Sequence, residues 1–273
     1  MEISIIVCVY NGEDVIVRCL DSVVNSSTAI LLGNLFELII IDDGSSDNTA
    51  LLLDGFRNVD GIKIKSISNS GLGAARNLAM TLAHGKYLYF LDADDFLITG
   101  GLVSLIQSIG SLDSDSIEFN IKKYTSDLSL KGSVFPEHDP FENLSREDYL
   151  LKVDKLRITA WSRFWKRSII TGNNIIFQEG VKFEDIFFAK EFYCKAQTFT
   201  YLDIDFYAYV LSEGSLTRKK RFDLNLFLDT WKIRRKNLRQ WRKEENDMLL
   251  RRLLASEVTN ANIKLVKILL KLI

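Results

Sequence analysis

Apolar and polar positions follow two rhythms along the first 110 residues. Short, nearly continuous apolar runs have the length and composition of strands buried on both faces. The segments between them place apolar residues three and four apart, as amphipathic helices do. Strands that alternate with helices in this way predict an α/β fold with a mostly parallel sheet and right-handed crossovers. The predicted strands are Glu2–Tyr10, Glu37–Ile41, Ile62–Ile67 and 86–91, and the predicted helices are Glu13–Asn25, one capped by Ser46 that runs through Phe56, and Gly71–His84.

The alternation weakens beyond Leu112. We expect 1–217 to form one domain, with 1–110 as its first half and 111–217 as its second, followed by a helical extension at 218–273. Residues 26–35 and Ser126–Asn143 read as irregular connections, and Ser145 with Asp148 reads as a helix start. In the second half we predict strands at Ser116–Lys123 and Phe199–Tyr209, and helices at Trp161–Ile170, Phe183–Tyr193, Arg221–Glu245 and Met248–Ile273.

Polar clusters follow the four predicted strands of the first half. In open parallel sheets, ligands bind in the crevice beyond the carboxyl ends of the strands. Because these ends share one edge of a sheet, we expect the four clusters to lie along one rim. They are Tyr10-Asn11, Asp42-Asp43, Asn69-Ser70-Gly71 and Asp92-Ala93-Asp94.

Three carboxylates, Asp92, Asp94 and Asp95, follow the fourth strand within four positions. Charges packed so closely repel one another, so they must be solvated, protonated or neutralised by a cation. Oxygen ligands at this density suit Mg²⁺ or Mn²⁺. The alternative is a solvated acidic turn without a metal ion.

Charge is distributed unevenly along the 273 residues, although the net charge is only −1. Residues 1–217 carry 19 Lys and Arg against 30 Asp and Glu, or −11, whereas 218–273 carry 16 against 6, or +10. A basic tail on an acidic body suggests an anionic partner surface.

Other residue types narrow the function classes. Only two histidines are present, which leaves little for a zinc site or a Ser-His-Asp triad, and Cys8, Cys19 and Cys194 lack metal-site spacing. We expect three reduced thiols in a cytoplasmic protein. The chain shows neither a signal peptide nor the roughly 18–20 apolar residues of a membrane span.

Four motifs in the first 110 residues resemble those of family 2 glycosyltransferases in order and spacing. They are S-I-I-V-C-V-Y-N ending at Asn11, E-L-I-I-I-D-D-G-S-S-D-N-T at 37–49, N-S-G-L-G-A-A-R-N at 69–77 and F-L-D-A-D-D at 90–95. The resemblance implies a GT-A-like (Rossmann-like) fold and a nucleotide-diphosphate-sugar substrate. Cys8 stands where members usually have proline, and 26–35 looks longer than usual.

The resemblance also implies roles for individual residues. Asp94, with Asp92, would bind the metal ion, and Asp42 or Asp43 would accept hydrogen bonds from the base or ribose. A loop with Ser215, Thr217 and Arg218 would close over the diphosphate. The remaining nucleotide-sugar contacts would come from Tyr10, Asn11, Glu13, Arg76, Asp92 and Ala93.

Sugar transfer with inversion needs a base that deprotonates the acceptor hydroxyl. Glu184 and Asp185 stand at the start of the predicted helix 183–193. Members of the family carry a similar Glu-Asp pair at the corresponding place, and this resemblance implies that Asp185 is the base, with Glu184 as the second choice. Acids here could instead favour the helix dipole. Trp161 resembles a family position near the acceptor, and Asp95 is the other acceptor-side candidate, expected to orient its neighbours or water.

The tail has a basic and an apolar helical face. Asn260, Lys264, Lys267 and Lys271 share the first, which suits an anionic membrane surface. The alternative is a helix docked on the acidic body of the protein itself. The basic residues lack an interleaved aromatic platform, so we do not expect nucleic acid binding.

Together these features predict a metal-dependent inverting glycosyltransferase at the cytoplasmic face of a membrane. The donor would be a UDP-sugar, and the acceptor a saccharide or lipid-linked saccharide in surface polysaccharide (O-antigen- or capsule-like) biosynthesis. One rival is a nucleotidyltransferase, which would usually show a Gly-rich basic loop where this chain has Tyr10–Asp14. The other is a non-catalytic protein that binds nucleotide sugars or tethers to membranes.

Overall fold

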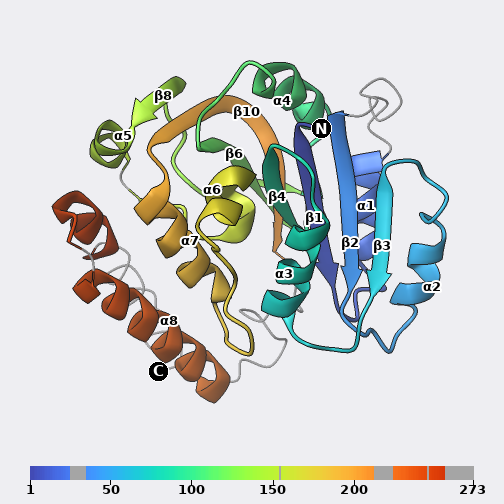
Figure 1. The fold of residues 1–273 in the computed structure, drawn as a ribbon. Coiled ribbons are helices and arrows are strands. Elements are labelled where there is room, and N and C mark those ends of the chain that lie inside the picture. Colours follow the sequence, from blue (N-terminus) through green and yellow to red (C-terminus); the bar gives the residue numbers. More distant parts are fainter. Residues whose placement is uncertain (25–34, 154, 212–223, 245, 256–273) are drawn as a thin grey trace.

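The computed structural model describes residues 1–24, 35–153, 155–211, 224–244 and 246–255. They form one mixed sheet with helices on both faces (Figure 1). The strands are β1 (Ile3–Val9), β2 (Phe36–Asp42), β3 (Ile62–Ser66), β4 (Tyr87–Asp92), β5 (Phe96–Leu97), β6 (Ser116–Thr125), β7 (Leu130–Ser133), β8 (Phe141–Ser145), β9 (Arg163–Lys166) and β10 (Thr198–Leu211). The helices are α1 (Ile16–Val24), α2 (Thr49–Asp54), α3 (Leu72–Leu82), α4 (Gly101–Ile109), α5 (Arg146–Lys152), α6 (Arg167–Gly172), α7 (Glu184–Lys195) and α8 (Leu224–Glu244), and 248–255 are also helical.

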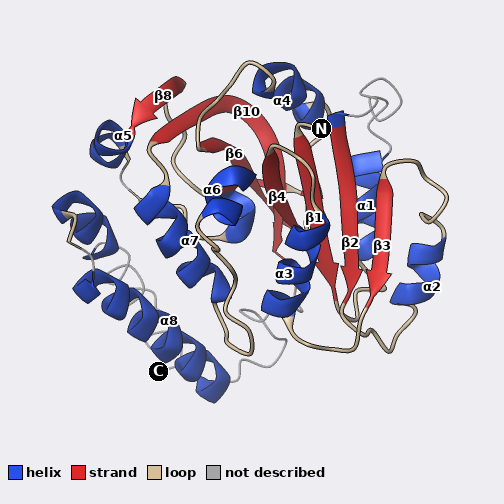
Figure 2. Ribbon diagram, viewed as in Figure 1, coloured by secondary structure: helices blue, strands red, loops and turns tan. Residues whose placement is uncertain are grey.

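Four parallel strands in the order β3-β2-β1-β4 build the first half of the sheet. Successive side chains of β1 enter opposite layers: Ile5 and Val7 pack in the cluster that contains α1, and Ile6 packs in the cluster that contains α3. Figure 2 shows helices on both sides of these strands. A strand covered on both faces must be apolar at nearly every position, so the continuous runs are explained. The predicted parallel sheet is confirmed.

The second half of the sheet joins the first through β9, which pairs antiparallel with both β4 and β6. The predicted helix Trp161–Ile170 is therefore wrong over its first six residues: a short 3₁₀ turn at Ala160–Ser162 leads into β9, and only from Arg167 onward, in α6, is the chain α-helical. Phe164 and Trp165 enter opposite core layers, which is the alternation of a strand. The pairing partners of β9 lie far away in the sequence, so the local pattern did not reveal them.

The start of α2 also differs from the prediction. The helix begins at Thr49 with Asn48 as its N-cap residue, and not at a Ser46 cap. The backbone N–H of Ser46 donates to the side chain of Asn11 at 2.8 Å, so Ser46 belongs to a loop contact. The Asp47 carboxylate accepts hydrogen bonds from the N–H and hydroxyl of Thr49 and thereby secures the first turn.

Residues 126–143 contain more structure than expected. β7 pairs with β6, and β8 begins at Phe141 and pairs with β10. The helix start at Ser145 is confirmed, because its hydroxyl accepts a hydrogen bond from the Asp148 N–H at 3.1 Å.

The described part of the C-terminal extension packs on the body of the protein. Leu238 and Trp241 of α8 belong to the same core cluster as Phe188 and Phe192 of α7. Residues 260–271 and the link at 26–34 lie outside the described residues, so the amphipathic tail and the domain boundary stay predictions. Among the described helices, none has the length and apolarity that crossing a membrane requires.

A buried ion cluster lies in the second half of the sheet. Glu118 of β6 is 1% exposed and pairs with Arg163 at 2.7 Å and with Arg157 at 3.1 Å. The hydroxyl of Tyr149 donates to the same carboxylate at 2.6 Å, and Arg163 also contacts the hydroxyl of Tyr193 on α7. One carboxylate therefore compensates two buried arginines and ties β6, β9, α5 and α7 together.

We expect Glu118→Gln to lower the free energy of unfolding by about 3–5 kcal/mol, because it leaves two buried guanidinium groups without their carboxylate. Chemical denaturation of the purified chain measures this quantity. The matched control is Glu142→Gln at an exposed position, which should change it by less than about 0.5 kcal/mol. Equal losses in the two variants would contradict the importance of the cluster.

Candidate functional site

The register of the parallel strands aligns the predicted functional segments. Val9 of β1 lies opposite Asp42 of β2, and Cys8 lies opposite Asp92 of β4. The strands therefore end together, and the residues that follow them meet at one rim of the sheet. The prediction of a shared rim is confirmed.

Side-chain hydrogen bonds connect the loop after β1 to the loop after β2. Asn11 adopts a left-handed conformation (φ +50°) and accepts a hydrogen bond from Ser46. The Glu13 carboxylate accepts hydrogen bonds from the backbone and side-chain N–H groups of Asn48, at 2.9 and 2.8 Å. Tyr10, by contrast, is 52% exposed at the rim. Asn11 and Glu13 thus shape the rim, while the ring of Tyr10 is available to a ligand.

Asp42 and Asp43 serve different neighbours. Both carboxylate oxygens of Asp43 accept backbone hydrogen bonds, from Ser70 at 2.7 Å and Gly71 at 2.9 Å, and so hold the loop after β3. Asp42 accepts one from the Ser45 N–H at 3.0 Å. Asp42 and Asp43 are 3% and 4% exposed, so which of them contacts the nucleotide stays open, as the sequence left it.

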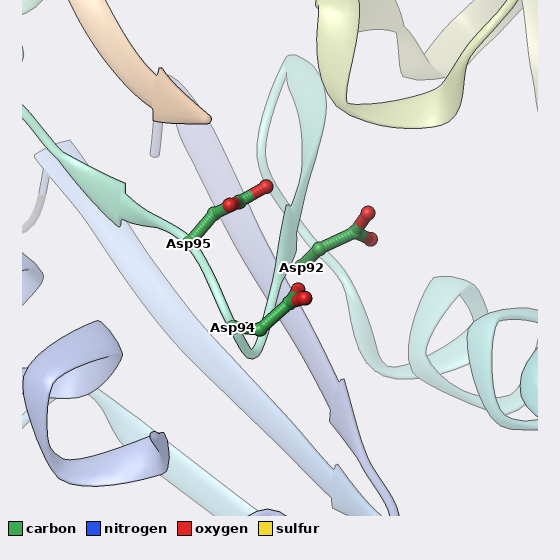
Figure 3. A group of neighbouring side chains, drawn as sticks. All are labelled: Asp92, Asp94 and Asp95. Carbon is green, nitrogen blue, oxygen red and sulfur yellow. The ribbon is translucent and has the colours of Figure 1, made fainter. Parts of the chain in front are cut away.

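The turn between β4 and β5 carries the three carboxylates, whose nearest ligand atoms all lie within 4.8 Å of one another (Figure 3). Asp92 and Asp94 are partly exposed, whereas Asp95 is 1% exposed and accepts hydrogen bonds from the Tyr207 hydroxyl and the Val210 N–H. Burial raises the pKa of Asp95 well above its usual range, and the charges of Asp94 and Asp92 raise it further. This interior position does not suit the predicted acceptor contact of Asp95, but it suits the role of orienting its neighbours.

Helix α1 supports this turn from outside. The guanidinium of Arg18 donates to the backbone carbonyl of Asp94 at 2.6 Å, and the Leu97 N–H donates to the hydroxyl of Ser22 at 2.9 Å. Neither Arg18 nor Ser22 was predicted from the sequence to belong to the site. One hint of the role of Arg18 is present in the sequence: it is a cation directly before the apolar pair Cys19-Leu20 in an amphipathic helix.

Arg76 connects the rim to α7. Its guanidinium donates to the Asp92 carboxylate at 2.9 Å and to the Glu184 carboxylate at 2.6 Å, and it is 4% exposed. Burial disfavours its charged form, but the charges of Asp92 and Glu184 outweigh this and raise the pKa of Arg76. Nearby, burial raises the pKa of the Cys8 thiol to about 12, which keeps it protonated at neutral pH. The predicted nucleotide contact of Arg76 stays a prediction.

The two candidate bases occupy the first turn of α7. Glu184 is buried in its ion pair with Arg76, whereas Asp185 is partly exposed and close enough to Arg76 to contribute to its raised pKa. Phe183 precedes them in a left-handed conformation (φ +60°) that costs a bulky residue about 1–3 kcal/mol. Glu184 is occupied by its ion pair with Arg76, and the assignment of Asp185 as the base stays a prediction.

Trp161 lies beside the carboxylate turn. Its ring stacks on Tyr207 at 5.2 Å and on Tyr209 at 5.4 Å between centroids. Because Tyr207 also donates to Asp95, the aromatic stack and the acidic turn form one continuous structure. Three further predicted residues, Ser215, Thr217 and Arg218, lie outside the described residues.

Comparisons with known proteins identify the family. The model of glycosyl transferase family 2 matches residues 4–166. A poly(ribitol-phosphate) beta-glucosyltransferase of Bacillus spizizenii is 32% identical over 78% of this chain and 33% of its own length. The minor teichoic acid biosynthesis protein GgaA of Bacillus subtilis is 30% identical over 83% of this chain and 49% of its own length. The chain thus spans half or less of the length of these two relatives.

A solved structure shares the fold. S. aureus TarS 1–349 in complex with UDP-GlcNAc superimposes with a TM-score of 0.72 and 21% identity, over 97% of this chain and 73% of that one. This confirms the predicted GT-A-like α/β fold with its mostly parallel sheet. With the family model covering more than half of its length, the chain belongs to glycosyl transferase family 2.

Proposed function

We propose that the chain transfers a sugar from a nucleotide-diphosphate sugar to a hydroxyl group of a saccharide or lipid-linked saccharide, with inversion at the anomeric carbon. Family membership supports sugar transfer. The UDP-GlcNAc complex of TarS supports a UDP-sugar donor. The names of the two Bacillus relatives support an acceptor in surface polysaccharide assembly.

One observation carries the proposal: the Arg76 guanidinium spans from Asp92, on the acidic turn, to Glu184, beside the candidate base. A sugar held at the turn would therefore lie next to the first turn of α7. Tyr10 and Asp42 on the same rim suit the nucleoside, because an exposed ring can stack on a base and a carboxylate can accept from a ribose or base donor.

The acidic turn fits a divalent cation. Asp92 and Asp94 offer partly exposed carboxylate oxygens on one turn, which are the donors that Mg²⁺ and Mn²⁺ prefer. Such an ion, when bound, neutralises the charge that develops on the leaving diphosphate. Asp95 would position the turn through Tyr207 and Val210.

The reaction is a single displacement. Asp185 takes the proton of the acceptor hydroxyl as that oxygen bonds to the anomeric carbon, and the bond from this carbon to the phosphate oxygen breaks. The nucleoside diphosphate leaves with the bonding electron pair. Glu184 is less suited to act as the base, because its carboxylate is buried against Arg76.

The basic extension supports docking at an anionic membrane. The exposed cations of α8 include Lys236, Arg239, Arg242 and Lys243. Each cation near an anionic bilayer contributes about 1 kcal/mol of attraction. This surface would bring the site to a lipid-linked acceptor on the cytoplasmic face.

Asp94→Asn should weaken manganese-dependent binding of UDP by at least about tenfold, because it replaces a charged ligand with a neutral one. Isothermal titration calorimetry with UDP, in Mn²⁺ and in EDTA, measures the effect. The control Asp139→Asn, at an exposed position outside the rim, should bind as the unaltered chain does. Equal UDP affinity in Mn²⁺ and EDTA would rule out the metal site.

Asp185→Asn should lower the rate of UDP release from UDP-sugars by about 10²–10⁴-fold, because it removes the base, while UDP affinity stays unchanged. A coupled assay for UDP across a panel of UDP-sugars measures the rate, with Asp139→Asn again as control. An unchanged rate would exclude Asp185 as the base. In a parallel assay with UTP and sugar 1-phosphates, release of pyrophosphate would favour a nucleotidyltransferase.

A further inference from the structure

A cavity separate from the candidate functional site lies between α7, α8 and residues 173–178. None of the predicted nucleotide or metal ligands lines it. Its volume is about 450 Å³, which is within the range of sites for small ligands. In Figure 1, α8 runs alongside α7. The extension thus completes a cavity that the catalytic body alone would leave open.

The lining suits an uncharged polyhydroxyl ligand. Five of the lining side chains are amides: Asn173, Asn174, Gln178, Asn237 and Gln240. An amide both donates and accepts hydrogen bonds, as a sugar hydroxyl does. Phe187 and Trp241 add aromatic surface, which suits the apolar faces of sugar rings. Lys190 and Glu191 contribute one charge of each sign, so the lining does not favour an anion.

Two residues of α8 that line the cavity are largely buried. Trp241 is 1% exposed, and its Nε1 donor has no acceptor among the described residues. Asn237 is 9% exposed and lines the same cavity. From α8 the cavity thus receives an aromatic side chain and an amide, which suit the apolar face and the hydroxyl groups of a sugar ring.

We propose that this cavity is a subsite for a neutral sugar unit of the acceptor, an inference that rests on the proposed function. Ile186 and Phe187, which line it, directly follow Asp185 on α7. The lining stripe ends at Glu191, about 9 Å further along the helix axis. A glycan with its terminal hydroxyl at Asp185 would pass round the N-terminal end of α7 and place an earlier sugar in the cavity.

Saturation-transfer NMR on the full chain tests the subsite directly. The probes are methyl β-D-glucopyranoside, methyl β-D-galactopyranoside and N-acetylglucosamine, with excess UDP and Mg²⁺ added to occupy the donor site. We expect saturation to be transferred from the protein to the protons of at least one of these sugars. The exposed substitution Gln240→Trp, which blocks the cavity, should weaken the signal about tenfold, and Asn237→Leu should weaken it through loss of the amide. Ile233→Ala, exposed on the same helix outside the lining, should leave the signal unchanged.

The outcomes separate the subsite from the reaction. Sugar signals that are unchanged by both cavity substitutions, or no saturation transfer to any of the three sugars, would overturn the subsite even if UDP-sugars are turned over. Sugar signals that depend on Gln240 and Asn237 would support the subsite even if no UDP is released. In an active enzyme, the substitutions should raise the KM for a glycan acceptor about tenfold and leave hydrolysis of the donor unchanged.

Discussion

The candidate site depends on one buried cation held between two carboxylates. Arg76 is reached by Asp92 from the sheet and by Glu184 from α7, so a single guanidinium fixes the distance between the acidic turn and the candidate base. The planar fork of arginine suits this geometry, whereas a lysine would offer only a point charge. Removing either carboxylate would leave buried charge poorly compensated, which makes the arrangement rigid.

The other supports of the site converge on the same turn. Arg18 holds the carbonyl of Asp94 from α1, and β10 holds the carboxylate of Asp95 through Tyr207 and Val210. The residues left partly exposed, Asp92, Asp94 and Asp185, are those that the proposed chemistry needs. Interior bonds thus fix the backbone and leave the reactive oxygens accessible, which is what preorganisation of a site requires.

Much of this site could be predicted from the sequence. Buried parallel strands are recognisable as apolar runs, and their carboxyl ends must lie at the same edge of the sheet. That reasoning placed Tyr10, Asp42 and Asp92 on one rim. It could not pair Arg76 with Glu184, which lies 108 positions away, nor show that Asp43 holds the backbone of Ser70. β9 was missed for the same reason. Its sequence fits a helix locally, and its strand partners β4 and β6 are distant in the sequence.

Diffraction at the manganese absorption edge, from crystals grown with UDP and Mn²⁺, tests the central claim most directly. The account predicts an anomalous peak about 2.2 Å from a carboxylate oxygen of Asp94, with the diphosphate of UDP beside the peak and the uracil ring near Tyr10. UDP bound along the rim without such a peak, or a peak away from the turn after β4, would contradict it.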